Sequence, residues 1–197
     1  TARSAMQDFF ESPQEVRDEI RVARQIHGAQ GYHVQGHENV AQLLGDFSAP
    51  PDLVERVVYK NLHRSREDGG LQQVDDFGDL PKWPSESRLP GFRAAISAYG
   101  DEITRLMRLL MQVSEVALEL QPGFFNAFYG PECGTNLQLA HYLRTRLSAG
   151  QIGEEEDVAF GAHTDSGGLT IIHLTEPGLQ VQLADGWHKV PVIEEAF

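Results

Sequence analysis

The hydrophobic periodicity of the chain changes at Pro122, and this change restricts the fold more than any other feature. Between Pro90 and Pro122, apolar residues recur at alternating spacings of four and three, which predicts one long amphipathic helix over 91–121. After Pro122 the period becomes two, which is typical of half-buried strands. Helices first and antiparallel strands afterwards favour helices packed on one side of a β sandwich or barrel over a parallel α/β sheet.

The heptad-like spacing within 91–121 also admits a coiled coil. Nothing else in the chain offers a partner stripe, so we expect this helix to pack along the outside of a sheet, with a local weakness at Gly100. The aromatic stretch 124–129 that follows is interpreted as core packing rather than as a direct substrate contact.

Strand signals concentrate in the second half of the chain. Apolar and polar residues alternate over 137–143 and 179–183, and 169–174 is a compact β-rich run. Asp185-Gly186, directly ahead of Trp187, predicts a tight hairpin turn.

The first 90 residues give weaker signals. Ser12-Pro13-Gln14-Glu15 reads as a capping box with proline at the first helical position, which predicts a helix over 13–27. Glycine and proline punctuate the stretch from 31 to 90, so we expect mostly connecting segments there, with a helix at 51–60.

Composition limits the functional classes. The 197 residues suit one domain, and 29 acidic against 16 basic residues give a net charge of −13. Such a chain is repelled by phosphate backbones and anionic membranes, and it has no apolar run of about 20 residues. Cys133 is the only cysteine, which excludes an intrachain disulfide and fits a reducing cytoplasm. We expect neither a nucleic-acid, a membrane nor an obligate protein partner.

His163 and Asp165 form the most informative pair of polar residues. On a strand, residues i and i+2 face the same way, so an imidazole and a carboxylate could reach one metal ion. They are two thirds of the facial triad that holds non-haem Fe(II). A zinc hydrolase that adds His141, His173 or His188 is a distant alternative.

The order of motifs around this pair resembles the iron/2-oxoglutarate-dependent dioxygenases of the isopenicillin N synthase-like family. The order is Gly161-Ala162-His163-Thr164-Asp165, Gly168-Leu169-Thr170, Gly178-Leu179-Gln180-Val181 and Asp185-Gly186-Trp187. Upstream, the likeness includes Phe9-Phe10, Gly31-Tyr32, Trp83-Pro84, Leu89-Pro90-Gly91-Phe92 and the stretch 137–142. It covers nearly the whole chain.

The resemblance implies a partial double-stranded β-helix (jelly roll) with flanking N-terminal helices. Residues 1–121 would be a helical and loop region, and residues 122–197 the first part of the oxygenase domain. His163 and Asp165 match two iron ligands, and Tyr142 matches a position that hydrogen-bonds 2-oxoglutarate, whereas the neighbouring position, often Asn, is Ala140 here.

The cofactor and cosubstrates implied are Fe(II), 2-oxoglutarate and O2, with a small organic metabolite oxidised at an unactivated C–H bond and succinate and CO2 released. Two alternatives stay open: an iron oxidase of isopenicillin N synthase type that uses no 2-oxoglutarate, and a non-catalytic jelly-roll fragment. The chain opens without Met and stops at Phe197 in an apolar stretch. We therefore expect the family's distal His and Arg-x-Ser to be encoded beyond Phe197.

Overall fold

The computed structural model describes residues 1–22, 29–36, 39–43, 45, 47–48, 51–60, 62, 81–129, 134–142, 160–165, 167–194 and 196. These residues form two compact units, Thr1–Thr164 and Asp165–Phe197. Among the described helices, none combines the length and the apolar character needed to cross a bilayer.

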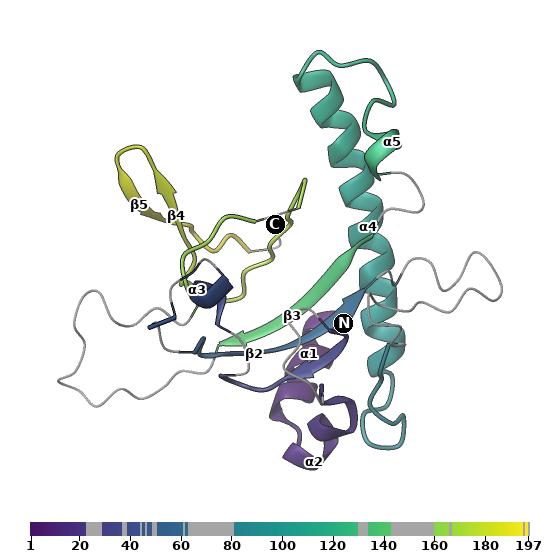
Figure 1. Cartoon of the computed structure of the whole chain (residues 1–197). Coiled ribbons are helices and arrows are strands. Elements are labelled where there is room, and N and C mark those ends of the chain that lie inside the picture. Colours follow the sequence, from purple (N-terminus) through teal and green to yellow (C-terminus); the bar gives the residue numbers. More distant parts are fainter. Residues whose placement is uncertain are drawn as a thin grey trace. The chain divides into compact units, whose positions relative to one another are not determined.

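The first unit contains a three-stranded antiparallel sheet in the order β1-β2-β3 (Figure 1). The strands are β1 (Gly31–His33), β2 (Val54–Lys60) and β3 (Asn136–Tyr142). Val57 on the central strand lies opposite Tyr32 on one side and Leu139 on the other. Since side chains alternate along a strand, these three residues share one face.

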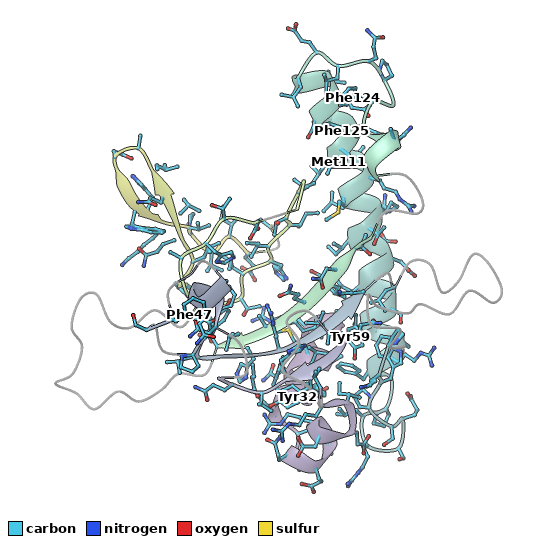
Figure 2. The ribbon with its side chains drawn as sticks, viewed as in Figure 1. Tyr32, Phe47, Tyr59, Met111, Phe124 and Phe125 are labelled. Atoms are coloured by element: carbon cyan, nitrogen blue, oxygen red, sulfur yellow. The ribbon has the colours of Figure 1, made fainter. Side chains whose placement is uncertain are left out.

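That face carries the hydrophobic core, which the helices α1 (Ala2–Glu11) and α4 (Phe92–Ala117) complete. α1 packs against α4, where the rings of Phe9 and Phe92 meet, and Phe9 also meets the ring of Tyr32 on β1. The buried cluster consists of Phe9, Phe10, Ile20, Tyr32, Val57, Tyr59, Leu62, Phe92, Ile96 and Leu139. Figure 2 labels the two buried tyrosines, Tyr32 and Tyr59.

The long helix predicted over 91–121 is confirmed as α4, and its first turns contribute Phe92 and Ile96 to the core beside the sheet. It ends at Ala117, and Glu119 then takes a positive φ of 54°, which a helix cannot continue. Farther along α4, Met111 is buried, and Figure 2 places it near Phe124 and Phe125 of the following segment.

The following segment is fastened to α4 by Glu115. This buried carboxylate accepts hydrogen bonds from the backbone N–H groups of Gly123 and Phe125, at 2.8 and 2.9 Å. A short helix, α5 (Asn126–Tyr129), comes next. The prediction that this aromatic stretch is core is wrong for Phe124, whose side chain is 46% exposed.

Two predictions for the N-terminal half are also wrong. The stretch expected to be a helix at 51–60 contains β2, because its valines lie buried between β1 and β3 and suit a strand. In place of the helix expected over 13–27, the described residues 13–22 contain α2 (Gln14–Arg17) and a 3-10 turn, η1 (Asp18–Ile20), before Arg21 bridges to Tyr32, and residues 23–27 lie outside the described part of the chain. A further short helix is α3 (Val40–Leu43).

The second unit contains a hairpin of β4 (Gln180–Leu183) and β5 (Gly186–Lys189). The predicted hairpin is confirmed, with Leu183 paired to Gly186 and the turn at Ala184-Asp185, one residue earlier than expected. The run at 169–174 is not a strand in the structure, so that prediction is wrong. No strand among the described residues pairs with this run, and an extended segment needs such a partner to form a sheet.

Candidate functional site

The face of β2 and β3 that points away from the aromatic core carries polar side chains. Register places Tyr142 opposite Val54, and Ala140 opposite Arg56. Arg56 is only 5% exposed, and its Nη1 donates a hydrogen bond of 2.8 Å to Oε1 of Gln138. A charged guanidinium and a phenol therefore share one face of the sheet.

Tyr142 lies in the electrostatic field of two charged groups on this face. Partial burial raises the pKa of its phenol, the carboxylate of Asp52 raises it further, and the guanidinium of Arg56 lowers it. A tyrosine is protonated at neutral pH even without this shift, so the phenol is able to donate a hydrogen bond.

Asp52 connects this face to the segment that carries His163. The side chain is buried, its Oδ2 accepts from the backbone N–H of Val40 at 2.8 Å, and its Oδ1 accepts from that of Gly161 at 3.2 Å. One carboxylate therefore ties together the beginning of β2, the first residue of α3 and the segment 160–164.

The ring of His163 is oriented by its own segment. Its Nδ1 lies 2.9 Å from the carbonyl oxygen of Gly161, and its ring meets that of Phe160 edge-on, with centroids 5.0 Å apart. A carbonyl can only accept, so Nδ1 carries a hydrogen, and in the neutral ring Nε2 then carries the lone pair. This is the tautomer that an Nε2 metal ligand needs.

Residues 160–165 are not part of a strand, so the expectation that His163 and Asp165 lie on one is wrong. The segment is held instead by the Asp52 carboxylate and by the contacts of His163. Asp165 is exposed and is the first residue of the second unit. Two residues of chain span at most about 7 Å, which limits the separation of the two Cα atoms.

A complete metal cluster is not found among the residues that the structure describes: no group of three or more His, Cys, Asp or Glu side chains is placed to hold an ion. The donors that are present, an imidazole with its Nε2 lone pair and a carboxylate two residues along the chain, are of the types that the facial triad uses. They fit two of its three protein positions.

His141, considered as a zinc ligand, belongs to the other face of the sheet. Its Nδ1 lies 2.7 Å from Oε1 of buried Glu55, which also accepts hydrogen bonds from Arg17 and Tyr32. This network links α2, β1, β2 and β3 next to the core, so its role is structural.

His173 and His188, the other two histidines considered as zinc ligands, belong to the second unit. His188 is an exposed hairpin residue bonded to Asp185 at 2.8 Å, and His173 is exposed and not in a strand. Cys133 lies outside the described residues.

Asp52 and Arg56 were not identified from the sequence. A helix at 51–60 would also have put these two residues, four apart, on one face, but only the pairing of β2 with β3 brings Arg56 to the sheet face of Tyr142. The buried valines of β2 were the available signal for a strand.

Comparison with known proteins finds relatives of a consistent kind. The chain is 28% identical to validamycin A dioxygenase of Streptomyces hygroscopicus subsp. limoneus over 199 residues. The matched region covers 98% of this chain and 50% of that protein. Over 150 residues it is 26% identical to isopenicillin N synthase of Streptomyces jumonjinensis, covering 73% of the chain and 45% of that protein. No protein-family model matches.

The chain is similar to the iron/2-oxoglutarate-dependent dioxygenases of the isopenicillin N synthase-like family. Fe(II), 2-oxoglutarate and O2 are the cofactor and cosubstrates that this family implies. The chain spans about half the length of the two curated relatives named above.

A solved structure shows the same fold. A full-length Neurospora crassa protein in complex with α-ketoglutarate (2-oxoglutarate) superposes with a TM-score of 0.72 at 24% identity, over 98% of this chain and 56% of that one. The same Neurospora crassa protein is also known in complexes with thymine and with 5-formyluracil. The mixed arrangement of helices and sheet predicted from the sequence is thereby confirmed.

Proposed function

We propose that this protein is an Fe(II)- and 2-oxoglutarate-dependent oxygenase that oxidises an unactivated C–H bond of a small organic molecule. The observation that carries the proposal is the position of His163: its Nδ1 is bound by Gly161, and its segment is tied by Asp52 to the sheet face of Tyr142. The curated relatives supply the reaction type.

His163, Asp165 and Tyr142 each have a distinct task in the proposal. His163 through Nε2 and Asp165 through its carboxylate are two of the protein ligands of the metal, and the protonated phenol of Tyr142 donates a hydrogen bond to the cosubstrate. Bound iron would supply the redox chemistry that couples decarboxylation of 2-oxoglutarate to C–H oxidation. The chain's own residues orient these groups and hold the Tyr142 proton.

The finer architecture is proposed on the same grounds. Residues 122–197 supply the first part of a double-stranded β-helix, and residues 1–121 form the flanking region, whose β2 pairs with β3. The family resemblance and the likeness to the Neurospora crassa structure support this assignment. The single cysteine, Cys133, fits a reducing compartment, which we propose is the cytoplasm.

The test is anaerobic addition of Fe(II) and 2-oxoglutarate to the full-length protein, followed by visible spectroscopy. We expect the metal-to-ligand charge-transfer band of an iron–2-oxoglutarate complex, and we expect His163→Ala or Asp165→Ala to abolish it. His188→Ala is the matched control, because this exposed histidine is bonded within the hairpin. Absence of the band from the wild-type protein, or its survival in both ligand variants, would refute the assignment.

A second candidate is an iron oxidase of isopenicillin N synthase type, which the match to the Streptomyces jumonjinensis enzyme favours. The two functions differ in their need for the 2-oxo acid. Substrate-dependent succinate release across a compound panel supports the oxygenase, whereas oxygen uptake with substrate and iron alone supports the oxidase.

A further inference from the structure

We propose that Asp52 is a positioning residue for His163. Through the backbone of Gly161, Asp52 sets the tautomer and the direction of the His163 imidazole. The inference deepens the proposed function and rests on it, since it assigns to a buried carboxylate the support of a metal ligand. Metal-binding histidines commonly need such a partner on the nitrogen that does not face the metal.

The contacts form a continuous path. Oδ1 of Asp52 holds the N–H of Gly161 at 3.2 Å, and the carbonyl of the same glycine holds Nδ1 of His163 at 2.9 Å. Fixing the nitrogen of Gly161 limits rotation of the residue that presents the carbonyl. The carbonyl in turn requires a hydrogen on Nδ1 and leaves the lone pair on Nε2.

Asp52 is itself held firmly enough to act as an anchor. It is only 6% exposed, and its other oxygen, Oδ2, accepts from the N–H of Val40 at 2.8 Å. Only Leu53 separates it from Val54, the first residue of β2, so its backbone is continuous with the central strand of the sheet. The position of His163 is therefore fixed relative to the central strand of the first unit.

The path requires a carboxylate rather than an amide. Two backbone N–H groups converge on Asp52, one on each oxygen, and a carboxyl group offers an acceptor on both sides whereas an amide offers one. An asparagine would turn its NH2 group toward one of the two N–H donors. Asp52→Asn keeps the size of the side chain and removes one acceptor, so it is the sharpest variant.

The test compares Asp52→Asn with Asp8→Asn, which removes a charge from an exposed position of α1. The first measurement, on the metal-free full-length protein, is the 15N spectrum of the His163 ring, assigned with a His163→Gln variant. We expect the wild type and Asp8→Asn to show the Nδ1–H tautomer and Asp52→Asn to show a mixture. Unchanged tautomers in folded Asp52→Asn would overturn the inference.

The second measurement is Fe(II) affinity under anaerobic conditions. We expect Asp52→Asn to weaken binding roughly 10-fold, as loss of the hydrogen-bonding support of a metal ligand does. Asp8→Asn should stay within about twofold of the wild type. In a His163→Ala background, Asp52→Asn should add little further loss, since the path ends at the missing ring.

These outcomes separate the inference from the proposed function. A wild-type protein with no iron–2-oxoglutarate band but an Asp52-dependent tautomer would refute the oxygenase and keep the path to His163. A normal band together with unchanged iron affinity in Asp52→Asn would keep the oxygenase and refute the path. Circular dichroism with thermal unfolding shows whether Asp52→Asn is folded. If it is not, the tautomer of His163 is measured in Asp52→Ala instead.

Discussion

Tyr32 and Tyr59 are both buried in the core, but their hydroxyl groups differ in hydrogen bonding. The hydroxyl of Tyr32 donates to the carboxylate of Glu55, which also binds Arg17 and His141. That of Tyr59 has no hydrogen-bond partner among the described residues, although its ring stacks on Trp83 with centroids 4.2 Å apart. The same substitution should therefore have opposite consequences at the two positions.

We expect Tyr32→Phe to lower the free energy of unfolding by about 1.5–3 kcal/mol, because a hydrogen bond to a charged, buried acceptor is lost. Tyr59→Phe should leave it unchanged within about 0.5 kcal/mol or raise it, since the ring contact with Trp83 stays and an unsatisfied hydroxyl is removed. Urea unfolding of the two variants measures both values. A loss at Tyr59 as large as that at Tyr32 would contradict this account.

At the level of elements, α4 depends on a glycine in its middle for its approach to the sheet. A Cβ at Gly100 would lie 3.2 Å from Cδ1 of Leu62 and 3.8 Å from Cδ2 of Leu137. The sequence predicts a local weakness at this residue, and the structure adds that it is a point of close packing between the helix and Leu62, with Leu137 of β3 in ordinary contact.

Enlarging Gly100 should destabilise the protein in proportion to the added volume. We expect Gly100→Leu to cost about 1–3 kcal/mol through overpacking against Leu62 and Leu137. Gly100→Ala should be nearly neutral, because the gain in helix propensity of about 1 kcal/mol offsets the tight contact. Ala94→Leu, at an exposed position of α4, is the control and should stay within about 0.5 kcal/mol. Equal effects at the two positions would show that packing at Gly100 is loose.

The elements that could be predicted from the sequence are those that depend on local pattern. The helix α4 carries its periodicity over 26 residues, and the β4–β5 hairpin has an adjacent turn signal. β2 has a short pattern and is stabilised as a strand by partners far along the chain, with Val57 lying between Tyr32 and Leu139. Such tertiary pairing is not visible in a window of ten residues.

At the scale of the whole molecule, some residues of the candidate site could be predicted from the sequence and others could not. His163, Asp165 and Tyr142 were selected because a motif order resembles a known family, and their roles stay predictions. Asp52 is separated from Gly161 by 109 positions. Its part in the site follows only from the fold, because no local pattern marks a buried aspartate as the anchor of a distant loop.

The stability of the whole molecule should fall in alkaline solution because its tyrosines hold their protons. Burial raises the pKa of Tyr32, Tyr59, Tyr99 and Tyr142, and Glu55 raises that of Tyr32 further. Below about pH 10 both the folded and the unfolded states are protonated at these groups, so they give no pH dependence. Above it the unfolded chain loses these protons first, and the free energy of unfolding falls.

Each tyrosine that stays protonated in the folded state contributes a slope of about 1.4 kcal/mol per pH unit. Urea unfolding at a series of pH values up to about 11 measures the total, and phenolate absorbance reports which groups have titrated. The double variant Tyr32→Phe, Tyr59→Phe should show a shallower decline, because it lacks the two tyrosines that are buried most completely. Lysines titrate in the same range in both proteins, so the difference between the two slopes belongs to the tyrosines. If the free energy of unfolding fell equally with pH in both proteins, burial in the core would not be raising the pKa values of Tyr32 and Tyr59.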